Sequence, residues 1–280
     1  MQRSLFAIAI ASILTTSAFA ADLAVKAPPI VPPVVFSWTG FYVGLNGGYS
    51  WGSTNNSFAT PLLPSASQSM NGWVFGGQAG YNWQFNPRWV FGVEGDIDAT
   101  GQRGTATLTP NSVVTVFVPP PAALALPTIT TTTTTAASLE EKLPWLATFR
   151  GRIGVLPSDR VLLYATGGLA VGEVKSTSLV GTTTTVVPSF GAGATATSAA
   201  ALASASTTRA GWTVGAGIEG AFAPNWTARL EYLYVDLGTL NNNFVGLGAF
   251  APLLTTSHVT DNIVRVGVNY RFGGPVVARY

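Results

Sequence analysis

Strict alternation between two unlike kinds of side chain is the feature that most constrains this sequence. Over residues 40–51, apolar side chains such as Phe41 and Val43 alternate with small or polar ones such as Gly44 and Asn46. A period of two residues is that of a β-strand whose two faces meet different surroundings. The sequence therefore predicts strands with one apolar and one polar face.

The same alternation recurs in later segments of similar length. Six of them have a clear parity, whereas the parity of residues 161–174 is ambiguous. These lengths match the roughly 9 to 11 residues that a tilted strand needs to cross the hydrocarbon layer of a membrane. The eight predicted strands cover about residues 40–51, 73–84, 89–98, 143–155, 161–174, 211–222, 226–237 and 262–272.

Short and long connections alternate between these strands, as they do in outer-membrane barrels. Short turns carry Pro87, Pro157 and Pro224, and the long connections cover residues 53–70, 100–142, 175–210 and 238–261. An even number of strands lets the sheet close on itself, which satisfies the backbone donors that lipid would leave unpaired. We therefore predict an all-β fold, an eight-stranded antiparallel up-and-down transmembrane β-barrel with short periplasmic turns and four long outer loops.

The first residues have the form of a secretory signal. Arg3 precedes an apolar stretch from Leu5 to Leu14, and Ala18-Phe19-Ala20 forms a cleavage pattern. The stretch is shorter than the roughly 20 residues of a membrane-spanning helix, so we expect export with cleavage. The predicted parts are a signal peptide (1–20), a Pro-rich periplasmic lead-in (21–36), an outer-membrane barrel (37–272) and a C-terminal extension (273–280).

Composition favours a membrane setting and excludes several kinds of site. Only 9% of the residues are charged, against about a quarter in soluble domains. The chain has no Cys, which excludes disulfides and thiolate metal sites. The net charge of +2 is scattered, so we expect no nucleic-acid partner. The sequence has neither a phosphate-binding loop nor a zinc-type cluster, and we expect no metal and no cofactor.

The 8 Trp residues all lie near the ends of predicted strands. Indole combines an apolar body with one N–H group and settles at a bilayer interface. A soluble ligand-binding barrel, with Trp at the ends of its core, is the alternative and would have an apolar interior. The predicted aromatic girdles are Trp38, Trp83, Trp89 and Trp226 on the periplasmic side and Trp51, Trp73, Trp145 and Trp212 on the outer side.

The polar parity carries charges of both signs, and in a barrel it would face the interior. An eight-stranded barrel is only about wide enough for its own side chains, and neighbouring strands can pair an acidic row with a basic row. We therefore predict a plugged, salt-bridged lumen, with a small-solute porin as the alternative function. The predicted charge network contains Glu94, Asp96, Asp98, Arg150, Arg152, Glu219, Arg229, Glu231, Arg265 and Arg271.

Catalysis is not expected from these residues. Each acid has a potential basic partner, and a charged row on one strand face is what lumen lining requires. His258, the only histidine, lies in the fourth predicted outer loop near Ser257 and Asp261. A lipid-modifying barrel enzyme could place a base there, but an ordinary polar loop residue is the interpretation that we favour. We predict that the protein is not an enzyme.

The long loops are rich in Thr, Ala and Ser, notably in residues 130–135, 182–185 and 192–206. Thr favours extended backbone and could lengthen the hairpins beyond the membrane. Small polar tracts can equally stay mobile, and Thr can carry glycans. We expect order near the membrane and mobility at the loop tips, and the sequence identifies no partner for the loops.

Three motifs carry a resemblance to a known family: residues 38–44 (WTGFYVG), 93–96 (VEGD) and 264–272 (VRVGVNYRF). Over about residues 36–272, the long loops excepted, the chain resembles the porin-family outer-membrane immunogenic proteins of alphaproteobacteria, within the OmpA-like barrel superfamily. The resemblance implies an abundant surface antigen that stabilises the envelope in the outer membrane of a Gram-negative cell. Its implied partners are outer-membrane lipid and lipopolysaccharide, with the barrel-assembly machinery during biogenesis. It further implies an assembly signal at Arg265, Gly267, Tyr270 and Phe272.

Overall fold

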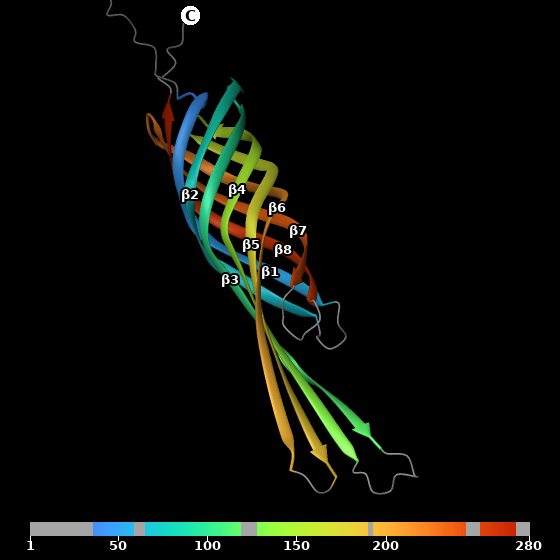
Figure 1. Ribbon diagram of the computed structural model, residues 1–280. Coiled ribbons are helices and arrows are strands. Elements are labelled where there is room, and N and C mark those ends of the chain that lie inside the picture. Colours follow the sequence, from blue (N-terminus) through green and yellow to red (C-terminus); the bar gives the residue numbers. More distant parts are fainter. Residues whose placement is uncertain (1–35, 59–64, 119–127, 190–192, 245–252, 273–280) are drawn as a thin grey trace, which may run out of the picture. The chain divides into compact units, whose positions relative to one another are not determined.

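The computed structural model describes residues 36–58, 65–118, 128–189, 193–244 and 253–272 (Figure 1). All of these lie within one compact unit, Val34–Tyr280. The predicted signal peptide, the lead-in before residue 36 and the extension after residue 272 lie outside the described residues and stay predictions. No helix among the described residues is long and apolar enough to cross a membrane.

Eight strands form one closed antiparallel ring, in which each strand pairs with the next and the last returns to the first. The predicted fold class and up-and-down topology are therefore confirmed. The strands are β1 Gly40–Phe58, β2 Ala66–Asn86, β3 Trp89–Phe117, β4 Ile129–Ser158, β5 Val161–Pro188, β6 Thr195–Ala223, β7 Trp226–Phe244 and β8 Leu253–Phe272 (Figure 1).

Three tight turns join β2 to β3, β4 to β5 and β6 to β7, at one end of the ring. Two of them contain Pro87 and Pro224, as expected. Pro157 instead lies within β4, and the turn itself is Asp159–Arg160. The register between β4 and β5 shifts from Val155 to Ser158, and such an irregularity tolerates a residue that has no backbone N–H to donate.

The apolar parity faces outward all around the ring. Phe41, Phe149 and Leu169 are 65%, 63% and 62% exposed, whereas the alternate residues on the same strands are buried. The ambiguous strand β5 turns its even-numbered residues inward, among them Leu162 and Val174. Its two faces look alike in sequence because the interior is itself apolar at both of these positions.

The strands β3 to β6 run far beyond the lengths predicted for them (Figure 1). The predicted loop over residues 100–142 instead continues the pairing of β3 with β4, with Thr130 opposite Val116. The same holds for much of residues 175–210, which pair β5 with β6. Alternation continues in this extension, where Leu108, Leu139 and Val180 form a buried apolar cluster. Of the three interpretations of the Thr-rich tracts, lengthened hairpins fit the described residues, while the tips at 119–127 and 190–192 lie outside them.

Candidate functional site

The barrel interior gathers nine charged side chains, here called the ionic cluster. They come from strands β3, β4, β6, β7 and β8, and each is at most 6% exposed. They point inward because they occupy the parity opposite to the outward apolar residues. The members are Glu94, Asp96, Asp98, Arg150, Arg152, Glu219, Arg229, Glu231 and Arg265.

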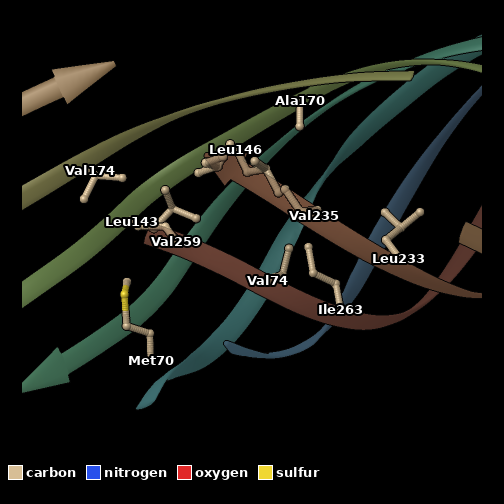
Figure 2. Close-up of a cluster of buried hydrophobic side chains, with 11 residues drawn as sticks. Met70, Val74, Leu143, Leu146, Ala170, Val174, Leu233, Val235, Val259 and Ile263 are labelled. Atoms are coloured by element: carbon tan, nitrogen blue, oxygen red, sulfur yellow. The ribbon is translucent and has the colours of Figure 1, made fainter. Parts of the chain in front are cut away.

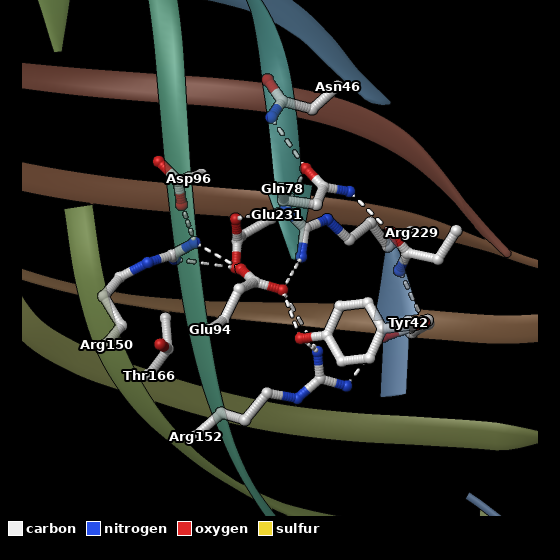
Figure 3. Close-up of polar contacts among 12 residues, drawn as sticks. Tyr42, Asn46, Gln78, Glu94, Asp96, Arg150, Arg152, Thr166, Arg229 and Glu231 are labelled. Carbon is white, nitrogen blue, oxygen red and sulfur yellow. Dashed lines mark hydrogen bonds and ion pairs between the residues drawn. The ribbon is translucent and has the colours of Figure 1, made fainter. Parts of the chain in front are cut away.

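Pairing between β3 and β4 sets the first contacts of the cluster. Glu94 lies directly opposite Arg150 in the register, and Arg150 Nη2 approaches Glu94 Oε1 at 2.5 Å and Asp96 Oδ2 at 2.6 Å (Figure 3). Thr148 donates to the same Asp96 oxygen at 2.8 Å. The acidic row of β3 therefore contacts the basic row of β4 as neighbouring strands allow.

Contacts between strands that are not neighbours complete the cluster. Arg265 on β8 places Nη1 2.8 Å from Asp98 and Nη2 3.0 Å from Asp96. Its Nε donates to Glu231 Oε2 at 2.8 Å. Arg150 donates to the other oxygen of Glu231 at 3.0 Å. These residues were predicted as network members, but their partners were not, because pairing patterns identify neighbouring strands and not the side chains that meet across a lumen.

Two tyrosines flank Arg152, and both lie over inward-facing glycines. The guanidinium carbon of Arg152 lies 5.4 Å from the Tyr42 ring centre and 4.6 Å from that of Tyr164. A Cβ on Gly80 would lie 2.3 Å from the Tyr42 hydroxyl oxygen, and one on Gly217 would lie 2.6 Å from that of Tyr164. The two glycines therefore make room for rings that donate to Glu94 and Glu231. Sequence reasoning missed both tyrosines as network members.

Apolar layers lie on both sides of the ionic cluster. Toward the tight turns, Trp38, Val90, Leu156, Leu162 and Tyr164 form a buried group, here called the turn-side layer. Toward the long connections lies a second group, here called the outer layer (Figure 2). The outer layer begins directly beyond the charges, since Leu233 follows Glu231 by two residues on β7. Its members are Met70, Val74, Leu143, Leu146, Ala170, Val174, Leu233, Val235, Leu237, Val259 and Ile263.

Trp38 is not part of an aromatic girdle. It is 0% exposed, and its indole Nε1 donates to the Asp159 carbonyl at 3.0 Å inside the turn end of the barrel. The residue precedes β1, so the period of two that orients the other Trp residues does not apply to it. Six of the predicted girdle residues are strongly exposed on the outer wall, and Trp145 is half-buried there: Trp51, Trp73, Trp83, Trp89, Trp145, Trp212 and Trp226.

Arg271 stands apart from the ionic cluster, although it too is buried. Its guanidinium donates to the backbone carbonyls of Ser37 and Thr39. The guanidinium also lies 4.4 Å from the Phe36 ring centre and 5.8 Å from that of Trp38. Its position at the last inward site of β8 brings it to the entering chain and not to a carboxylate. Arg271 therefore fastens residues 36–39 into the turn end of the barrel.

The four residues of the predicted assembly signal lie on both faces of β8. Arg265 and Gly267 face inward and are buried, whereas Tyr270 and Phe272 lie on the outward parity. The rings of Tyr270 and Phe272 are 5.1 Å apart, and Tyr270 lies 5.1 Å from Trp226. An exposed aromatic group therefore marks the turn end of the last strand.

A second buried polar group lies beyond the outer layer, and sequence reasoning missed it. Glu141 is 0% exposed. It accepts a hydrogen bond from Gln68 Nε2 at 2.7 Å and one from Ser257 Oγ at 3.3 Å. Burial raises the pKa of the Glu141 carboxyl, and the hydrogen bonds oppose that rise. One feature of the sequence could have revealed this site. Leu139 and Leu143 share the parity of Glu141, so the strand pattern continues through a tract that was predicted to be a loop.

The candidate base of the fourth predicted loop lies on a strand, away from its supposed partners. Ser257 and Asp261 face the interior and are buried, whereas His258 lies on the outer parity of β8. His258 Nε2 is 3.7 Å from Asp236 Oδ2, and its Nδ1 is 3.4 Å from Thr239 Oγ1. Period-two alternation separates Ser257 from His258, so the two do not form a nucleophile and base pair.

Comparisons with known proteins identify a family and several relatives. The family model of the outer membrane protein beta-barrel domain matches residues 6–272. The 31 kDa outer-membrane immunogenic protein of Brucella melitensis is 33% identical over 285 residues, covering 96% of this chain and 100% of that protein. The 22 kDa outer membrane protein of Rhizobium leguminosarum is 30% identical over 134 residues, 48% of this chain and 50% of that protein. The structure of Ail from Yersinia pestis matches with a TM-score of 0.31 and 16% identity, covering 83% of this chain and 99% of that chain.

Proposed function

Because this chain belongs to the outer membrane beta-barrel family and is a surface protein of the outer membrane, we propose that it is a structural element of the envelope whose own side chains close the lumen to solutes. The observation that carries the proposal is the order of the layers along the interior. The ionic cluster lies between the turn-side layer and the outer layer. A solute would have to pass two apolar groups and a cross-linked set of charges.

The energetics of the cluster favour a fixed plug. Removing one member of a buried ion pair typically costs 3–5 kcal/mol, because the remaining charge stays buried and unpaired. Arg150 contacts Glu94, Asp96 and Glu231 within 3.0 Å, so any rotamer that opened a path would break several such contacts. The cluster therefore resists the rearrangement that a conducting state requires.

The proposed role does not include catalysis. Each carboxylate of the ionic cluster has an arginine nitrogen within 2.8 Å, which leaves none poised as a general base. The side chain of His258 faces outward from β8, whereas that of Ser257 faces inward. The relatives that match over most of this chain are named as outer-membrane immunogenic proteins.

Conductance in planar lipid bilayers tests the closed lumen. The folded chain should give no sustained conductance steps, while a general porin reconstituted in parallel should give them. Heat-modifiable migration on a detergent gel establishes that the sample contains the folded barrel. Reproducible channels from that folded sample would overturn the proposal in favour of a small-solute porin.

The proposed biogenesis uses the end of β8. Tyr270 and Phe272 are the outward-facing members of the assembly signal that the family resemblance implies, and they lie at the turn end of β8. The machinery that inserts the barrel reaches them there from the periplasm. The exposed ring of Phe272, beside the partly buried Tyr270, supports this role.

A further inference from the structure

Three basic side chains stand side by side on the outer wall of the barrel. Arg103 on β3 is directly opposite Lys142 on β4, and Lys142 is directly opposite Lys175 on β5. The three residues, here called the cation row, all lie on the outward parity, with 44% of the Lys142 side chain and 52% of the Lys175 side chain exposed. Like charges directly opposite each other on neighbouring strands are destabilising. The row therefore calls for an anionic partner.

Carboxylates of the protein supply only part of that partner. Lys142 Nζ is 2.9 Å from Glu140, and Lys175 Nζ is 3.6 Å from Glu173. Arg103 has no hydrogen bond or ion pair with any residue that the structure describes. Three cations against two carboxylates leave a net positive charge, and the unpaired group is the guanidinium, which binds phosphate through two parallel hydrogen bonds.

The cation row lies at the depth of lipid headgroups. Trp145 donates through Nε1 to Glu173 Oε2 at 3.0 Å. Lys175 follows Glu173 by two residues, about 7 Å further along the tilted strand in the direction away from the tight turns. A Cβ on Gly101 would lie 2.3 Å from the Trp73 indole nitrogen, and Arg103 follows Gly101 by two residues as well. Because indoles settle at the membrane interface, cations just beyond them meet the phosphates.

The row occupies one side of the barrel only. The residues that flank the row on the neighbouring strands are neutral: Asn71 on β2 lies opposite Arg103, and Ser206 on β6 lies opposite Lys175. Below the row, Ile97, Phe149 and Leu169 present exposed apolar side chains to acyl chains, at 63%, 63% and 62% exposure. Charge above and apolar surface below match a phosphorylated lipid.

We propose that Arg103, Lys142 and Lys175 bind the phosphates of lipopolysaccharide lipid A in the outer leaflet. The inference rests on the proposed outer-membrane role, because it requires the long hairpins to face the cell exterior. The row lies at the end of the ring opposite the tight turns, where the outer leaflet meets the barrel. Lipid A carries both the phosphates and the acyl chains that this wall accommodates.

A titration of the folded full chain in detergent with diphosphorylated lipid A tests the site. The double variant Arg103→Gln/Lys142→Gln should bind about 25-fold more weakly than the unmodified chain, at about fivefold for each cation removed near an anionic lipid surface. The matched control Arg88→Gln/Arg160→Gln removes two exposed arginines from the tight turns and should leave binding unchanged. Arg103→Lys should retain most of the binding.

Two further ligands in the same titration identify the source of the phosphate. Dephosphorylated lipid A should bind the unmodified chain and the double variant equally. Millimolar inorganic phosphate should compete only weakly with lipid A, because it lacks the acyl chains. Equal binding by the double variant and the unmodified chain, or equal binding of both lipids, would overturn the inference. Heat-modifiable migration of every variant shows separately that the barrel has folded, so a failed lipid site leaves the structural role standing.

Discussion

Glu94 and Arg229 form an ion pair across the full width of the barrel. They lie on β3 and β7, which are four places apart in the ring, and Arg229 Nη1 is 2.5 Å from Glu94 Oε2. A single pair can cross the lumen because eight strands leave an interior only about as wide as side chains. The polar parity of each strand therefore holds the opposite walls together and fills the space between them.

Arg150→Gln should destabilise the barrel more than any exposed substitution. The change leaves Glu94, Asp96 and Glu231 each without one arginine contact, and breaking a buried ionic contact costs about 3–5 kcal/mol. Urea unfolding in lipid vesicles measures the free energy of unfolding. Arg160→Gln, in an exposed turn, is the control and should change it by less than about 0.5 kcal/mol. Equal effects of the two variants would contradict a tightly paired cluster.

Trp38→Ala should behave as a core truncation and not as the loss of an interfacial residue. Trp38 is fully buried and packs with Val90 and Leu162, so the substitution should cost about 3–5 kcal/mol. Trp226→Ala changes an exposed indole at the same end of the barrel and should cost distinctly less. The measurement is again unfolding in vesicles, and a smaller loss for Trp38→Ala than for Trp226→Ala would argue for the girdle position.

Glu141 should make the barrel less stable as the pH rises. Its pKa in the folded state is raised above the ordinary value of 4.5 by burial. The unfolded chain therefore loses this proton first, and folding stability falls between the ordinary and the raised pKa. Below that window the carboxyl is protonated in both states and adds no pH dependence.

The Glu141→Gln variant removes this titration. Its stability relative to the unmodified chain should rise with pH through that window and then level off, as measured by unfolding at a series of pH values. Gln68 Oε1 has no hydrogen-bond partner, so it can accept from the new amide. A stability difference that does not change with pH would contradict a titrating Glu141.

Phe272→Ala should lower the amount of folded barrel in the outer membrane without a matching loss of stability. The ring is 56% exposed, so its removal leaves no core cavity, whereas the proposed assembly signal loses its terminal aromatic. Phe149→Ala removes a similarly exposed ring from the middle of the wall and serves as the control. Heat-modifiable protein in outer-membrane fractions is the readout, and equal yields of the two variants would remove the assembly role from Phe272.

The alternation of side chains was enough to predict the ring, the order of its connections and the faces of most strands. It did not orient β5, because Leu162, Ala170 and Val174 face an apolar part of the interior and look like membrane-facing residues. The alternation also predicted strands that are too short at the end opposite the tight turns. Thr130 to Thr135 carry no contrast between faces, yet β-branched side chains suit the paired hairpins in which they lie.

The charge network was predictable by strand and only partly by partner. Glu94 and Arg150 could be matched because they belong to neighbouring strands, whereas Arg265 reaches Asp98 across the ring. Arg271 has the same parity, but it binds backbone carbonyls beside Trp38. The positions of Arg271 and Trp38 both depend on how the chain enters the barrel. Contacts that depend on closure of the ring leave no mark on local periodicity.

Single introduced cysteines test most directly which face of the sheet meets lipid. The chain has no Cys, so a fluorescent label on Phe149→Cys or Leu169→Cys reports one outward site, and a label on Ser65→Cys reports an exposed site at the long-hairpin end. In vesicles whose acyl chains carry nitroxide groups, we expect strong quenching at 149 and 169 and little at 65, with water-soluble thiol reagents reacting only at 65. Labels at 149 and 169 that escape lipid quenching and react readily with those reagents would contradict a hydrocarbon-surrounded barrel.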